Sequence, residues 1–225
     1  DFYFQFSRAD NEAAIELFER LLAEDPDYAP ALAGLANALV QKVVRWPDEP
    51  NAPEYKRLAD ALKSGRTDTS ASRVALARAQ AYAERAVSLA PTNPEAHKAL
   101  GFVFAARRQF EPSLKQYREA VRLDPNAWGA LINIGDVLEI SGKPAEALPC
   151  FEDAYAAMSR IYQSQSARVR PWFDELGVLI GRRHRDRGDF KWAEVWFRRV
   201  LDDAPLNQAA TSELARLDRK STRLN

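Results

Sequence analysis

The chain has 225 residues, 46% hydrophobic and 28% charged, which fits a globular protein of one or two domains rather than a disordered tail. No apolar run approaches the roughly 18 residues that a membrane-spanning helix needs, and a net charge of 0 removes any bulk attraction to nucleic acid or anionic membranes. The single cysteine, Cys150, cannot form an internal disulfide. One cysteine and two histidines, His97 and His184, are too few ligands for a Cys/His metal cluster.

Helical segments that end at a proline recur along the chain. Before most of these prolines a small residue is followed by a large one four positions later and a small or aliphatic one three after that. This spacing places the three on one helix face. The first copy is Ala14, Phe18 and Leu21. Because proline cannot continue a helix, each segment is predicted to end before it. The closing prolines are Pro26, Pro91, Pro125 and Pro205.

A second pattern lies upstream of the first. His97, Leu100, Gly101 and Phe104 form one copy, and similar copies begin at Leu32, Leu131 and Gly177. The small residue lets this first helix approach the second helix of the same unit closely, while the bulky one fills the gap between units. Each such hairpin buries one face only, so several must stack.

These residues resemble the tetratricopeptide repeat family, whose 34-residue period and W-x2-L-G-x2-Y, A-x3-F, P pattern match best over 94–159 and 174–207. His97 and Leu131 replace the tryptophan of that pattern, and Ser113 replaces its alanine. The resemblance implies an all-α, right-handed α-solenoid of stacked antiparallel hairpins, which acts as a protein-binding scaffold. The N-terminal repeats also resemble the corresponding region of bacterial multidomain regulators.

We predict a single array over residues 1–217. Its second hairpin contains an inserted loop at 46–72, in which three prolines forbid a continuous helix and residues 54–63 could form a short one. The second helix of the fourth hairpin is predicted to extend to about Ser166, with a bend or an irregular first turn at Pro149. The predicted hairpins are 1–28, 29–93, 94–127, 128–173 and 174–207, followed by a terminal helix at 208–217.

The two ends of the chain lie outside the repeat pattern. The chain begins at Asp1 without an initiator methionine, so we expect a fragment of a longer protein. The last eight residues, 218–225, read like the translation of a sequencing adapter or else a disordered polar tail. We assign these eight residues no function. For the protein we expect a cytoplasmic location, while a periplasmic one stays open.

Catalytic motifs are absent from the sequence, so we expect no enzyme activity and no cofactor. There is no G-x-x-x-x-G-K-[ST], G-x-G-x-x-G, H-E-x-x-H or G-x-S-x-G. His97 and His184 occupy packing positions of their repeats, and Cys150 is read as a structural thiol. Two alternatives stay open: a regulatory region of a larger bacterial regulator with a winged-helix, cyclase or kinase domain, and an accessory region of an enzyme.

Recognition is expected along the concave surface of the first helices. The clamp that some family members use for acidic chaperone tails needs polar residues where Ala33, Phe102 and Ile132 stand, so we predict a peptide or protein with apolar anchors instead. Residues 1–60 are acidic and residues 160–200 basic, which leaves self-association open. Because the net charge of the whole chain is 0, we do not expect nucleic acid as its partner. The predicted partner-binding residues are Asn37, Lys98, Phe102, Ile132, Asp136, Arg182 and Arg185.

Overall fold

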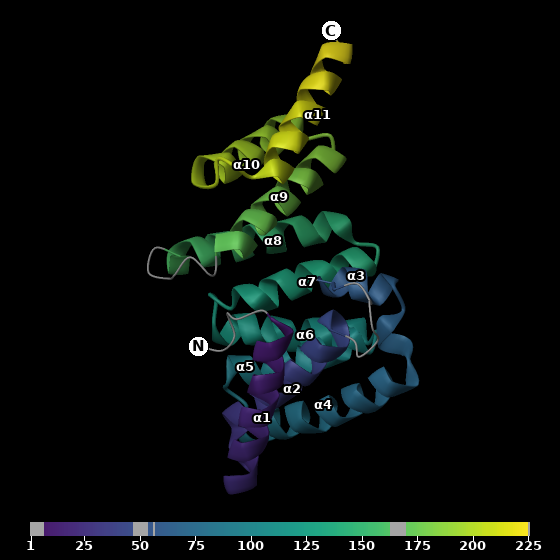
Figure 1. Cartoon of the computed structure of the whole chain (residues 1–225), viewed down its shortest axis with the longest axis vertical. Coiled ribbons are helices and arrows are strands. Elements are labelled where there is room, and N and C mark those ends of the chain that lie inside the picture. The colour runs from purple at the N-terminus through teal and green to yellow at the C-terminus, as the bar shows by residue number, and fades with distance from the viewer. Residues whose placement is uncertain (1–6, 47–53, 56, 163–169, 225) are drawn as a thin grey trace. The chain divides into compact units, whose positions relative to one another are not determined.

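The computed structural model describes residues 7–46, 54–55, 57–162 and 170–224, and the regular structure in these ranges is helical, without strands (Figure 1). Consecutive helices pack in pairs, which confirms the predicted all-α solenoid of stacked hairpins. The chain divides into two compact units, residues 1–150 and 151–225. The division falls inside one helix, α8, which runs from Pro144 to Tyr162.

Unit 1 stacks its hairpins through their first helices. The first helix α2 packs against both its own second helix α4 and the next first helix α5, and α5 in turn packs against its second helix α6. The insertion between α2 and α4 contributes α3 and the short 3-10 helix η2. The elements of unit 1 before α8 are α1 (Arg8–Glu24), α2 (Ala29–Arg45), α3 (Leu58–Lys63), η2 (Arg66–Asp68), α4 (Ser70–Leu89), α5 (Pro94–Ala106), α6 (Phe110–Leu123) and α7 (Trp128–Ile140).

Unit 2 contains the end of α8 and three further helices. In it α10 packs against both α9 and α11. The core of these three helices is built around Phe197 and Val200 of α10, with Val178 of α9 and Ala210 of α11 beside them. The bounds are α9 (Arg170–Asp186), α10 (Phe190–Asp203) and α11 (Gln208–Leu224).

Helix ends follow the local signals of the sequence. Side chains of Ser7, Thr69 and Asn93 accept hydrogen bonds from backbone N–H groups in the first turns of α1, α4 and α5. Four helices, α1, α4, α6 and α10, end two residues before a proline, as predicted. The prolines are Pro26, Pro91, Pro125 and Pro205.

Close approach within a hairpin depends on a small residue facing an aromatic ring. A Cβ atom on Gly101 of α5 would lie 2.8 Å from Cδ1 of Tyr117 on α6, and Gly181 of α9 meets Phe197 of α10 in the same way. Both rings are fully buried. The sequence therefore predicted correctly why glycine stands at this position of the repeat.

The insertion differs from its prediction at both ends. Its short helix α3 begins at Leu58 rather than near residue 54, and α4 begins at Ser70 rather than near residue 73. The early start of α4 follows from Thr69, whose Oγ1 accepts from the N–H of Ser72 at 3.1 Å.

The later helices also depart from the predicted bounds. α8 is an uninterrupted helix with Pro149 inside it, without the irregular first turn expected there, and residues 163–166 of its predicted extension lie outside the described residues. α9 begins at Arg170 instead of residue 174, because proline is well accommodated in a first turn. α11 continues to Leu224, so residues 218–224 are helical rather than a disordered tail.

Replacing Gly101 by alanine tests the close packing. The new methyl group would overlap the ring of Tyr117, so we expect the free energy of unfolding to fall by about 1–3 kcal/mol. Gly129→Ala on α7 is the matched control, since its nearest neighbour, Cδ of Lys98, lies 3.9 Å away. The control should leave stability unchanged or raise it by up to about 1 kcal/mol. Urea unfolding followed by circular dichroism measures both, and equal effects would contradict the packing argument.

Candidate partner-binding surface

Five of the predicted partner-binding residues lie on the first helices of unit 1. Asn37 is on α2, Lys98 and Phe102 are on α5, and Ile132 and Asp136 are on α7. Asn37, Lys98 and Ile132 are half-buried, whereas Phe102 and Asp136 are buried, with 4% and 1% of their surfaces exposed. We call the side-chain surface of α2, α5 and α7 the first-helix surface. Binding of a partner to it stays a prediction.

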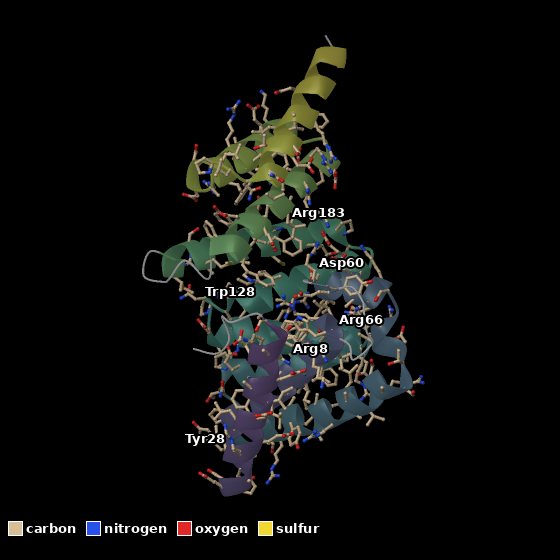
Figure 2. All side chains as sticks on the ribbon, viewed as in Figure 1. Arg8, Tyr28, Asp60, Arg66, Trp128 and Arg183 are labelled. Carbon is tan, nitrogen blue, oxygen red and sulfur yellow. The ribbon has the colours of Figure 1, made fainter. Side chains whose placement is uncertain are left out.

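The insertion packs on this surface. α3 contacts both α2 and α7, beside which Figure 1 shows it. Asp60 and Arg66 mark the segment in Figure 2. The apolar side of α3 is buried there, and this side consists of Leu58, Ala59, Ala61 and Leu62.

An arginine at the start of α3 meets two carboxylates of α7. Arg57 donates from Nε to Oδ1 of Asp136 at 3.0 Å and from Nη2 to Oε2 of Glu139 at 3.0 Å, and Nη2 also contacts Asp136. The Asp136 side chain is 1% exposed and that of Arg57 is 22% exposed. A carboxylate so far removed from water needs a cationic partner, and a residue 79 positions earlier in the chain supplies it.

The electrostatics of this pair follow from burial and charge together. Burial raises the pKa of the Asp136 carboxyl above its ordinary value, while Arg57 acts in the opposite direction. For Arg57, burial disfavours the charged form, but Asp136 and Glu139 outweigh it and the pKa of the guanidinium is raised. The arginine is therefore charged at every physiological pH.

Arg108 forms hydrogen bonds at the other end of α3. It lies in the turn after α5 with a φ of 60°, in the left-handed region, where the corresponding turns after α7 and α9 carry Gly142 and Gly188. Such a backbone costs a non-glycine residue about 1 kcal/mol or more. The side chain makes contacts that a glycine lacks, because Nη2 donates to the carbonyl of Leu62 and Nε to Oδ1 of Asp68 at 3.3 Å.

Arg66 attaches the insertion to the end of α2. Its Nη1 donates to the carbonyl oxygens of Val44 at 2.9 Å and Arg45 at 3.2 Å, which lie at the carboxyl end of that helix. Nearby, the buried Arg45 pairs with Glu54 at 2.9 Å. The insertion is thus held by α2, by α7 and by the turn after α5.

In unit 2, the predicted residues Arg182 and Arg185 of α9 meet one carboxylate of α11. Nε of Arg182 lies 2.8 Å from Oε1 of Glu213, and Arg185 contacts the other carboxylate oxygen. Arg216 approaches Glu213 at 3.3 Å. Glu213 is 2% exposed. These two arginines therefore have an intramolecular role, and partner binding by them stays a prediction.

The histidines and the cysteine have local partners. His97 places Nδ1 2.7 Å from Oε1 of Gln116 and Nε2 2.8 Å from the carbonyl of Pro91. His184 Nε2 lies 2.9 Å from Oε1 of Glu152, and Cys150 Sγ lies 3.6 Å from the carbonyl of Glu146. Within the ranges that the structure describes, no group of three or more His, Cys, Asp or Glu side chains could hold a metal ion. No helix there is both long and apolar enough to span a membrane.

Sequence reasoning missed Arg57, Arg108 and Glu213. The sequence contained a signal for each of the two arginines. Arg57 directly precedes the amphipathic segment 58–62 of the insertion, and Arg108 stands 34 residues before Gly142, where the repeat favours glycine. The sequence contained no signal for Glu213, because the residues around it follow the same pattern as those around an exposed glutamate on a helix.

Comparison with known proteins bears on both units. Two family models described as tetratricopeptide repeat match residues 6–42 and 103–162. The chain is 31% identical over 120 residues to "Protein CTR9 homolog" of Arabidopsis thaliana, which is 53% of this chain and 10% of that protein. It is 29% identical over 158 residues to "Cellulose synthase operon protein C" of Pseudomonas fluorescens (strain SBW25). This match covers 70% of this chain and 11% of that protein. The chain thus spans about a tenth of these relatives.

Solved structures show the same fold. A thermophilic TPR protein of Thermus thermophilus aligns with a TM-score of 0.57 and 19% identity, covering 93% of this chain and 91% of that one. MamA aligns with a TM-score of 0.53 and 17% identity, covering 93% of each chain. At these identities the likeness concerns the fold.

The cluster around Glu213 can be tested by mutation. Glu213→Ala leaves three arginines without their shared carboxylate. We expect the free energy of unfolding to fall by about 2 kcal/mol, a value discounted because the arginines reach water. Glu194→Ala is the matched control on α10, since the pair of Glu194 with Arg198 is exposed, and it should cost less than about 0.5 kcal/mol. Urea unfolding compares them. Equal losses would show that Glu213 contributes no more than a surface pair.

Proposed function

Because the chain belongs to the tetratricopeptide repeat family, whose stacked repeats form binding surfaces for other proteins, we propose that it binds a partner protein along its first-helix surface. The partner contributes an extended or helical segment, and the array holds it without catalysing a reaction.

One observation carries the proposal. The first-helix surface of unit 1 accommodates a segment from outside the repeat pattern, with a helix of six residues packed on α2 and α7 and an arginine paired with Asp136 and Glu139. A surface that binds one such segment of its own chain has the shape and charge to bind a similar segment of another protein.

Other side chains of the same surface stay partly exposed. Asn37, Lys98 and Ile132 are half-buried and lie on three successive first helices. Together they offer an amide, a cation paired with Glu95 and an apolar contact. This mixture suits a partner that has apolar anchors and a polar backbone.

The test is capture of partners from the organism by the tagged chain, with quantitative mass spectrometry. The double variant Lys98→Ala, Ile132→Ala removes two contacts of the first-helix surface, each at a half-buried position. We expect it to retain about a tenth or less of each specifically captured partner, as loss of a little more than 1 kcal/mol implies. Phe102 is unsuitable for this purpose because it is buried, and its removal would cost about 3–5 kcal/mol of stability.

The matched control lies on the second helices. Val74 of α4 is 72% exposed, and Val74→Ala should leave both folding and capture unchanged. If the double variant folds like the parent and captures the same partners in the same amounts, the first-helix surface is not the binding site.

The length of the relatives favours a second candidate function. Since the matched regions form 10% and 11% of those proteins, we also propose that the array is the docking region of a longer protein. Sequencing the gene on both sides of this reading frame tests it. A contiguous domain in frame supports the proposal, and start and stop codons directly at the two ends oppose it.

A further inference from the structure

The insertion presents a compact set of binding groups to the first-helix surface. Arg57 reaches Asp136 and Glu139, and the buried side chains of Leu58 and Leu62 lie one helical turn apart on the adjoining helix. In chemical terms this is an arginine followed by an amphipathic turn with leucines at its first and fifth positions. The docked insertion therefore shows which ligand chemistry the surface accepts.

The hairpin that contains the insertion closes without it. α2 and α4 pack directly against each other, and α2 also packs against α5. α3 has only six residues, too few to be stable as a helix by itself, so its order depends on its docking. Segments of this kind open locally at a lower free energy than the core of a domain.

We propose that the part of the first-helix surface around Asp136 and Glu139 is a binding site for an Arg-Leu-x-x-x-Leu helical segment of a partner protein, and that residues 57–69 of the insertion occupy it until such a segment replaces them. The proposal rests on the proposed function and specifies the partner's chemistry.

Two carboxylates explain why the partner carries arginine. The planar guanidinium of Arg57 reaches both Asp136 and Glu139, through Nε and Nη2, whereas a lysine ammonium acts as a single point charge. Asp136 is buried, so a partner that lacked a cation would leave its charge unpaired. Partners with acidic or purely apolar anchors are therefore selected against at this site.

Because residues 57–69 are tethered to the surface that they occupy, a partner segment must bind tightly enough to displace them. An internal segment competes at an effective concentration of about millimolar or more. Only molecules in which the internal segment is undocked can bind a free segment, so the apparent affinity for the free segment falls in proportion to the undocked fraction. Weakening the insertion's own contact should consequently strengthen binding in trans. This opposite sign separates a competing segment from a merely structural one.

The experiment uses the complete chain and an N-acetylated, fluorescent peptide with the sequence of residues 57–69. Arg57→Gln in the chain removes the insertion's ionic anchor and leaves Asp136 and Glu139 in place. We expect it to bind the peptide about tenfold or more tightly than the parent chain, measured by fluorescence anisotropy. The peptide with Arg57→Gln should bind the variant chain about 30-fold more weakly, and the double chain variant Arg57→Gln, Asp136→Asn should lose binding of the parent peptide.

Arg78→Gln is the matched control for the chain. Arg78 lies on α4 and pairs with Glu19 at 2.7 Å, with both side chains about half exposed, and its variant should bind the peptide no better than the parent does. Equal peptide affinity of the parent, the Arg57→Gln and the Arg78→Gln chains, or no binding to any of them, overturns the inference.

Hydrogen exchange of the unmodified chain decides the matter if Arg57→Gln fails to fold. The backbone N–H groups of Asp60, Ala61 and Ser64 close the turns of α3. We expect them to exchange at least about 100-fold faster than the slowest amides of α2, through local opening. Exchange of both sets at the same rate would mean that the insertion leaves only when the unit unfolds, which overturns the proposal.

The results separate this inference from the proposed function. If partners are captured through Lys98 and Ile132 but their binding is unaffected by Arg57→Gln, the scaffold stands and the competing role of the insertion is wrong. If the peptide binds as expected but no partner depends on Lys98 and Ile132, the site is real and the wider first-helix surface is not used.

Discussion

A helical hairpin buries only one side of each of its helices, and every other feature of this chain depends on that constraint. Small residues let paired helices approach until an aromatic ring fills the space between them, as Tyr117 does against Gly101. Stacking then buries the remaining apolar faces. Within unit 1 it also places α2, α5 and α7 so that their outward side chains form one surface. The packing that stabilises the fold thereby creates the surface on which another segment can dock.

That surface is charged where it is least accessible to water. Asp136 is almost fully buried, and the cation that balances it comes from the insertion. Unit 2 uses the same arrangement, since Glu213 is equally buried and is surrounded by arginines. The zero net charge of the chain conceals this pairing. A buried carboxylate that depends on a removable cation gives a surface its selectivity, because a ligand without that cation leaves the charge uncompensated.

The repeat period predicted most helices within a few residues, since caps, prolines and apolar spacing act over one or two turns. The repeat pattern gave no information where a residue's neighbours lie outside the period. Phe102 and Asp136 were predicted to contact a partner; the structure buries both side chains, and partner binding by them stays a prediction. Arg57 was missed altogether, because its partner lies 79 residues away and the insertion has no repeat to align. The local signs were the position of Arg57 directly before the amphipathic segment 58–62, and Arg108 at a position where the later turns have glycine.

The sequence by itself determined that the chain forms stacked helical hairpins, where most helices end, and which residues allow close packing. These properties depend on neighbours three to eight residues apart, and the pattern of the chain records them directly. The tertiary structure alone decided that α3 packs on α2 and α7, that Arg57 neutralises Asp136, and that Arg182 and Arg185 share Glu213. Such contacts depend on how distant segments meet in space. The periodicity of the sequence carries no information about the path of an insertion that lies outside it.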